Sequence, residues 1–294
     1  MKLRLSLCLL APLATLVIVV MAAGDQPSQS QNLNHVSMEV AVLQTLHDLE
    51  LKSSQLTKLS KLARESAPKG ENRVPAKTSA EFAAALTNLH AAYAKGDEQR
   101  ISECREKLDA LIEKQAPELD NSVVITAEAK GNAAEALKLL NARQTGMFLA
   151  TMELTDPTEL LLSAIQQVRQ LKKEKEREEE IASVAEEVAW LVHGLDEDEA
   201  SQKIKEKVTE LLQRVGEKKS DDDDASDREV LEEEARQIAA DVDNMQIIGH
   251  ILEHGMAEML SNPRLEAAIR TQTRLASKPS PAKKTAPPAK SPRD

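Results

Sequence analysis

Two histidines and a glutamate near the C-terminus form the pattern in this chain that comes nearest to a catalytic site. His250 and His254 are four residues apart, and Glu253 lies between them. On a helix this spacing puts both imidazoles on one face, where they can bind a single zinc ion. A neighbouring glutamate can then act as the general base of a hydrolase. A zinc-dependent enzyme is therefore one hypothesis.

This HxxEH pattern resembles that of the inverzincin metallopeptidases. A third ligand would have to come from another helix, and Glu258 and Glu266 are acids nearby in the sequence. The competing interpretation puts both histidines on the polar face of an amphipathic helix whose inner face carries Ile251, Leu252 and Met259. We favour this second interpretation, because the resemblance covers only five residues and an α/β peptidase context is not predicted.

The other polar clusters in the sequence give weaker evidence for a metal or catalytic site. The run Asp221–Asp224 with Asp227 has the charge to attract calcium, but it lacks the alternating oxygens and the central glycine of an EF-hand. A solvated linker is the simpler interpretation. No glycine-rich nucleotide loop and no nucleophile elbow is present in the sequence. We therefore expect a protein that is not an enzyme and that needs no metal or other cofactor.

The composition predicts an all-α fold. The chain of 294 residues holds two Phe, one Tyr and one Trp, while its hydrophobic residues reach 41%. Such a core is aliphatic, and an apolar spacing of three and four residues recurs along the chain. Only the stretch Val123–Ile125 resembles a strand, and without a visible partner strand we interpret it as a linker or a helix start.

The N-terminus predicts export. Lys2 and Arg4 precede an apolar run from residue 5 to residue 20, and small residues follow it, as in a secretory signal peptide over residues 1–23. An uncleaved membrane anchor is the alternative. Cys8 would leave with the leader, so Cys104 would be either a buried hydrophobe or a route to a disulfide-linked homodimer.

Composition shifts divide the rest of the chain into two antiparallel helical modules, residues 33–150 and 157–275. We expect a disordered linker at 24–32, an acidic linker at 217–225 and a disordered basic Pro/Lys/Ala tail at 276–294. The formal charge of −11 disfavours nucleic acid and anionic membranes as partners.

The second module is predicted to open with one long charged helix. Asp156 and Pro157 are a strong start signal, and Gly194 is a strong stop signal. The charged run from residue 172 to residue 180 between them contains no helix breaker, so one helix from Pro157 to His193 is the simplest account. A turn inside that run is the alternative. A long helix would suit coiled-coil association in a structural or scaffolding role.

A pair of leucine and glutamine patterns remains in the first module. The segment 49–62 reads LELKSSQLTKLSKL, and a shorter version begins at Leu140 and reads LNARQ, followed by Phe148. In each, a leucine ends one segment, a polar residue caps the next helix, and the glutamine can bond the backbone of the turn. Asn141 is a good N-cap, whereas in the first segment Ser53 or Ser54 would have to act in place of Lys52.

These two segments resemble the LTxxQ motif of the Spy/CpxP family of bacterial periplasmic helical proteins. The residues that match the motif are Leu49, Leu51, Gln55, Leu59, Leu62, Leu140, Gln144 and Phe148. The resemblance implies an exported, non-enzymatic protein of the periplasm or cell envelope. Its partners would be unfolded proteins or envelope components, and a homodimer is an open alternative.

Overall fold

The computed structural model describes residues 27–70, 73–74, 76–115, 117–217, 225–240 and 242–277. Within these residues the regular elements are all α-helices, as the composition predicted, and none of the described helices is long and apolar enough to cross a membrane. The expected leader, the aspartate run and nearly all of the basic tail lie outside the described residues.

The first six helices are α1 (Pro27–Leu49), α2 (Ser53–Ser66), α3 (Ala80–Lys95), α4 (Glu98–Lys114), α5 (Ala127–Leu137) and α6 (Ala142–Leu149). The next six are α7 (Pro157–Gln170), α8 (Glu174–His193), α9 (Glu199–Glu217), α10 (Ala225–Ala239), α11 (Asn244–Ser261) and α12 (Leu265–Ala276). Helix α1 begins at Pro27, inside the segment that we expected to be a disordered linker.

Many helix ends follow from local residue types. The hydroxyl of Ser79 accepts the N–H of Phe82 at the start of α3. The carboxylate of Asp156 accepts the N–H groups of Thr158 and Glu159 at the start of α7. These oxygens satisfy backbone donors that the first helical turn leaves without a partner. The start and stop signals at Asp156 and Gly194 are both confirmed.

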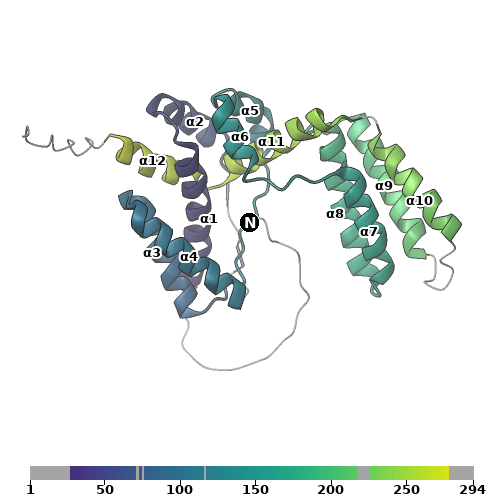
Figure 1. The fold of residues 1–294 in the computed structure, drawn as a ribbon, viewed down its shortest axis with the longest axis horizontal. Coiled ribbons are helices and arrows are strands. Elements are labelled where there is room, and N and C mark those ends of the chain that lie inside the picture. The colour runs from purple at the N-terminus through teal and green to yellow at the C-terminus, as the bar shows by residue number, and fades with distance from the viewer. Residues whose placement is uncertain are drawn as a thin grey trace, which may run out of the picture.

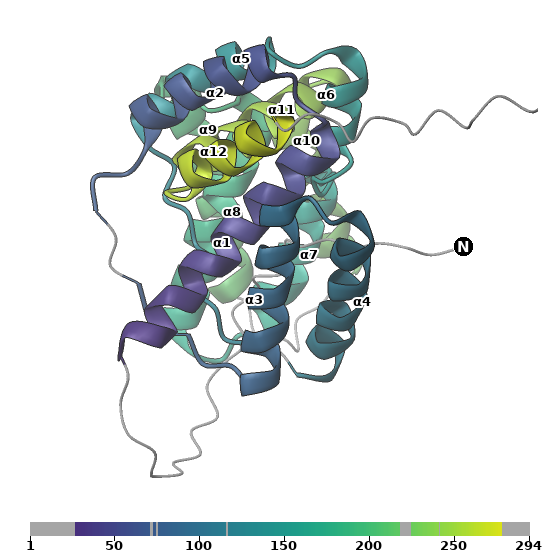
Figure 2. The same cartoon turned by 90° about the vertical axis from the view of Figure 1, so that its left-hand side faces the viewer.

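The helices enclose two main hydrophobic cores (Figures 1 and 2). The first core joins α1–α6 with α11 and α12, and the second joins α7–α10. The expected boundary between residues 33–150 and 157–275 is therefore wrong for the last two helices. Their apolar side chains, including Met256, Leu260 and Ile269, are buried in the first core. Helix α12 returns beside α1, so both ends of the described chain belong to the same unit.

The predicted long helix is wrong as well. Helix α7 ends at Gln170 and α8 begins at Glu174, so the chain turns inside the charged run. Val168 and Ile181 explain the turn, because both are buried in the second core. On one straight helix their Cα atoms would lie about 20 Å apart along the axis. The turn brings both apolar stripes to one core, with α7 and α8 side by side in Figure 1.

A buried charge cluster fixes α12 to α1 and α3. The carboxylate of Glu39, only 7% exposed, accepts hydrogen bonds from Arg264 Nη2 at 2.6 Å and Nε at 3.1 Å. His90 Nε2 lies 3.2 Å from its other oxygen. Burial alone would raise the pKa of Glu39, but the hydrogen bonds from His90 and Arg264 outweigh it and hold the pKa below its usual value. The cluster therefore stabilises the ionised carboxylate.

Candidate functional site

The two LTxxQ-like segments meet in space. Gln55 lies in the first turn of α2, and Gln144 lies in the first turn of α6. The side-chain nitrogen of Gln55 is 2.8 Å from the side-chain oxygen of Gln144, across 89 residues of sequence. We call this pair of glutamines the glutamine clasp.

Each glutamine first caps its own helix. Gln55 Oε1 accepts the N–H of Lys52 at 2.8 Å, and Gln144 Oε1 accepts the N–H of Asn141 at 3.0 Å. At α6 the side chain of Asn141 also accepts the N–H of Gln144, which completes a capping box. The expected N-cap role of Asn141 and the bond from each glutamine to its turn are thus confirmed.

The start of α2 is capped less completely. Lys52 occupies the N-cap position and has no side-chain oxygen to accept a hydrogen bond. The expectation that Ser53 or Ser54 takes this role is wrong, because the helix already begins at Ser53. The lysine therefore removes half of a capping box that α6 has in full.

Each glutamine then bonds the other segment. Gln55 Nε2 donates to the carbonyl of Leu139 at 2.6 Å, and Gln144 Nε2 donates to the carbonyl of Leu49 at 3.0 Å. Leu49 is the last residue of α1, where carbonyls have no partner within the helix. Gln144 is only 4% exposed, and a buried amide is stabilising when its donors and acceptor are all used. The clasp thus joins the α1–α2 turn to the α5–α6 turn.

The other motif residues support the clasp from the first core. Leu49, Leu59, Leu62 and Phe148 are buried in it, and Leu51 and Leu140 are half-buried against it. Every other motif residue predicted from the sequence therefore belongs to the first core or packs against it. Their apolar side chains contribute packing rather than chemistry.

Two residues at the rim were not predicted. Glu50 adopts a positive φ of 48° in the α1–α2 turn, a conformation that is costly for residues other than glycine. Its carboxylate lies 2.9 Å from the guanidinium of Arg143, and both side chains are largely exposed. Exposed pairs of this kind add little stability. No sequence signal marks Glu50, because neither its φ nor its partner is encoded locally.

A groove of about 370 Å³ adjoins the clasp. It is lined by Leu46, His47, Glu50, Leu51, Leu56, Glu98, Gln272 and Ala276. The side-chain nitrogen of Gln272 is buried and has no hydrogen-bond partner among the described residues. The groove therefore combines apolar leucines with two carboxylates.

The histidines of the HxxEH pattern lie in the joint between the two cores. We define this joint by the buried residues Leu191, Ile247 and Ile251. His250 Nδ1 lies 2.8 Å from the carbonyl of Leu191, in the last turn of α8. His250 therefore binds a carbonyl that the end of a helix leaves free.

His254 packs on the same helix end. Its ring stacks on that of Trp190, with centroids 4.1 Å apart and planes 15° from parallel. Burial lowers the pKa of His254 to about 4, and the positive charge of Lys130 acts in the same direction. Glu266, one of the nearby acids in sequence, instead pairs with Arg64. Among the described residues no group of three metal-binding side chains is found.

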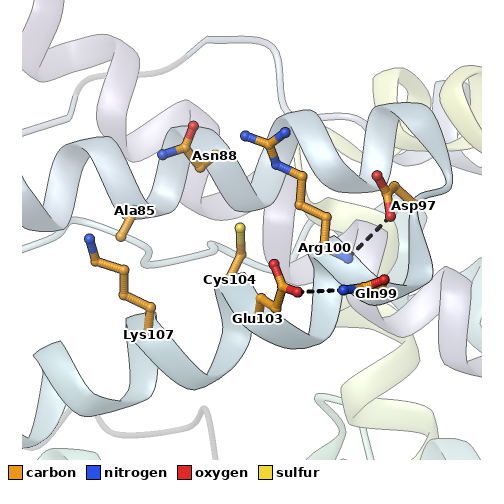
Figure 3. Close-up of a pocket in the computed structure, with 8 residues that line it drawn as sticks. All are labelled: Ala85, Asn88, Asp97, Gln99, Arg100, Glu103, Cys104 and Lys107. Carbon is orange, nitrogen blue, oxygen red and sulfur yellow. Dashed lines mark hydrogen bonds between the residues drawn. The ribbon is translucent and has the colours of Figure 1, made fainter.

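Cys104 lines a second groove, between α3 and α4. Figure 3 shows its sulfur directed toward α3, with Arg100 and Lys107 along the same helix. The groove measures about 420 Å³ and is mostly polar in its residues. Cys104 is half-buried and packs partly against the first core. It is thus neither a fully buried hydrophobe nor a fully exposed thiol.

No family model, curated protein or solved structure matches the chain.

Proposed function

We propose that this chain is an exported, non-enzymatic helical protein that binds other proteins, similar to members of the Spy/CpxP family. The glutamine clasp carries the proposal. Two segments that resemble one motif lie together, and their glutamines perform the same two tasks. That equivalence supports treating Gln55 and Gln144 as two copies of a motif rather than as chance matches. The partners would be unfolded proteins or components of the cell envelope.

The groove beside the clasp supports the proposal. Leu51 belongs to the motif and is only half-buried, so its apolar surface lies at the groove. An apolar side chain of a client would gain burial there. The overall negative charge would keep complexes from associating further.

Light scattering tests the proposal. The chain from Asp25 onward, stripped of metal by chelator, is mixed with insulin whose chains aggregate after reduction. We expect near-stoichiometric suppression of scattering. No suppression at a large excess of the chain would contradict client binding.

Two matched variants locate the binding surface. Leu51→Gln places an amide in the groove, whereas Val230→Gln makes the same kind of change on α10, where Val230 is 54% exposed and away from the groove. We expect Leu51→Gln to weaken suppression several-fold and Val230→Gln to leave it unchanged. Circular dichroism and thermal unfolding establish that both variants fold. Equal effects would place binding elsewhere.

The alternatives have less support. The scaffolding role was based on one long helix, which the structure divides into α7 and α8. The peptidase hypothesis needs His250 and His254 free to bind zinc, yet both are engaged in the joint. We expect the chain, incubated with excess zinc and then dialysed, to retain no stoichiometric zinc. One zinc per chain, lost in the His250→Ala, His254→Ala double variant, would revive that hypothesis.

A further inference from the structure

The joint between the two cores is small, and it is formed by one end of α8 against one half of α11. Its buried residues are Leu191 on α8 and Ile247 and Ile251 on α11, each at most 8% exposed. In Figure 1, α11 extends from the first group of helices to this end of α8. Because the two cores have no buried residue in common, the joint can separate while both cores stay packed.

Two imidazoles of α11 complete the joint. His250 Nδ1 lies 2.8 Å from the carbonyl of Leu191, and a side chain at Gly194 would come within 3.2 Å of the same ring. Beside them the ring of His254 lies nearly parallel to that of Trp190, with the centroids 4.1 Å apart. Ring packing of this kind leaves no room for water, so the stack is suited to a neutral imidazole.

Lys130 on α5 is the charged group that acts on His254. It disfavours a second positive charge there, in addition to the effect of burial. Lys130 is itself paired with Glu197, in the connection between α8 and α9. His193, in the last turn of α8, is paired with Asp198 in the same connection. The ion pairs near the joint are therefore formed without His254.

No carboxylate offsets a positive charge on His254. On α11 the nearest acids in sequence are Glu253 and Glu258, and among the described residues no ion pair joins either of them to His254. Glu187 on α8 interacts with other carboxylates instead. A cation stacked on an indole is attracted to its face, but burial and the charge of Lys130 act against the charged ring.

Acid should therefore work against the closed joint. Burial, and then the charge of Lys130, lower the pKa of His254 from its ordinary value of 6.5 to about 4. When the ring is released to water it takes up its proton more readily, so its contribution to the joint is present above pH 6.5 and is lost as the pH falls toward 4. Between pH 7 and pH 5 the ratio of open to closed chains should rise about twentyfold.

We infer that the joint is an acid-sensitive hinge, in which protonation of His254 releases α8 from α11 and the two groups of helices separate without unfolding. Opening uncovers Leu191, Ile247 and Ile251 together with the ring of Trp190, an apolar surface that the closed protein covers. Such a hinge would operate whether or not the chain binds clients.

Trp190 provides the measurement, because it is the one tryptophan in the sequence and it stacks on His254. The chain from Asp25 onward, which keeps every described helix, is compared at pH 7 and pH 5 with EDTA present. We expect the emission to shift to longer wavelength and acrylamide quenching to become several-fold more effective at pH 5. Far-UV circular dichroism should keep its helical signal, and small-angle X-ray scattering should show a larger radius of gyration.

Three substitutions of His254 separate charge from shape. His254→Phe keeps a ring for the stack and cannot be protonated, so the emission, quenching and radius of gyration should be the same at both pH values. His254→Arg places a permanent positive charge in the joint and should give the open signals already at pH 7. His254→Met has a long side chain without charge and should stay closed at both pH values. Circular dichroism and thermal unfolding check that each variant folds.

Several results would overturn the inference. One is unchanged emission, quenching and radius of gyration in the wild type between pH 7 and pH 5. An equal acid response in wild type and His254→Phe would assign the response to another group. A folded His254→Arg that stays closed at pH 7 would show that charge at this position does not open the joint. Loss of the helical signal together with the emission shift would show global unfolding in place of a hinge.

Discussion

The side chains of Gln55 and Gln144 each form two kinds of hydrogen bond with the backbone. The oxygen of each accepts an N–H at the start of its own helix, and the nitrogen of each donates to a carbonyl in the segment just before the other's helix. Gln55 Nε2 reaches Leu139 at 2.6 Å, and Gln144 Nε2 reaches Leu49 at 3.0 Å. The two side chains also bond each other at 2.8 Å. Two side-chain amides therefore connect the turn between α1 and α2 to the turn between α5 and α6, and each amide is a hydrogen-bond partner of the other.

Removing either glutamine should destabilise the fold. We expect Gln55→Ala and Gln144→Ala each to lower the free energy of unfolding by about 1–3 kcal/mol, because each leaves buried carbonyls or N–H groups without a partner. The double variant should lose clearly less than the sum, since the partners are shared. Urea unfolding measures all three. Gln272→Ala is the control, because the side chain of Gln272 forms no hydrogen bond with the described residues, and should change stability by less than about 0.5 kcal/mol. Strict additivity would contradict the clasp.

Restoring the missing cap of α2 should stabilise the protein. Lys52→Thr supplies an oxygen for the N–H of Gln55, the bond that Asn141 already makes at α6. We expect the free energy of unfolding to rise by about 0.5–2 kcal/mol. Lys52→Val is the matched control, since it has a similar shape and no acceptor. If Lys52→Thr and Lys52→Val change the free energy of unfolding equally, a side-chain cap is not the cause of the change.

Replacing Arg264 alone should lower the free energy of unfolding more than replacing both Arg264 and Glu39. Arg264→Met leaves the carboxylate of Glu39 buried beside His90 alone and should cost about 3–5 kcal/mol. Glu39→Gln combined with Arg264→Met removes the uncompensated charge and should recover part of that loss. Urea unfolding at pH 7 compares the variants. A double variant no more stable than Arg264→Met would contradict this account.

The same cluster predicts a loss of stability in acid. In the folded state the pKa of Glu39 is held below its ordinary value of 4.5. Its contribution is therefore present above pH 4.5 and is lost as the pH falls through the lowered folded pKa. We expect Glu39→Gln to flatten the stability profile below pH 4.5. An unchanged profile there would show that Glu39 does not carry this dependence.

His254 predicts a second pH dependence at higher pH. Its folded pKa is about 4, below the ordinary value of 6.5, so the unfolded chain takes up the proton first as the pH falls. Its contribution is fully present above pH 6.5 and is lost between pH 6.5 and pH 4. Between pH 7 and pH 5 the loss should be about 2 kcal/mol. His254→Phe keeps a ring to stack on Trp190 and should remove this part of the dependence. If wild type and His254→Phe lose the same free energy of unfolding between pH 7 and pH 5, His254 is not the source of this pH dependence.

Several expectations from the sequence held because the interactions behind them are local. Asp156 and Asn141 cap helices through bonds to residues two or three positions away. An aliphatic composition with few aromatics was enough to predict helices throughout. The bond from each clasp glutamine to its own turn likewise spans three residues.

The expectations that failed concern which apolar faces meet. Hydrophobic burial has no direction, so a stripe on a helix shows that it packs but not against what. Helix α11 could have continued the unit of α7–α10, yet Met256 and Leu260 are buried in the first core and Ile251 in the joint. The charged run before Ile181 contains no breaker, and the turn there brings Val168 and Ile181 into one core.

By itself, then, the sequence determined the helices, their caps, the aliphatic core and the two glutamine patterns, since these depend on residues within a few positions of one another. Only the tertiary structure decided that Gln55 and Gln144 bond each other and that His250 and His254 hold the end of α8. Each of these depends on groups brought together from distant parts of the chain. Their meeting is fixed by the packing of whole helices and not by any local spacing.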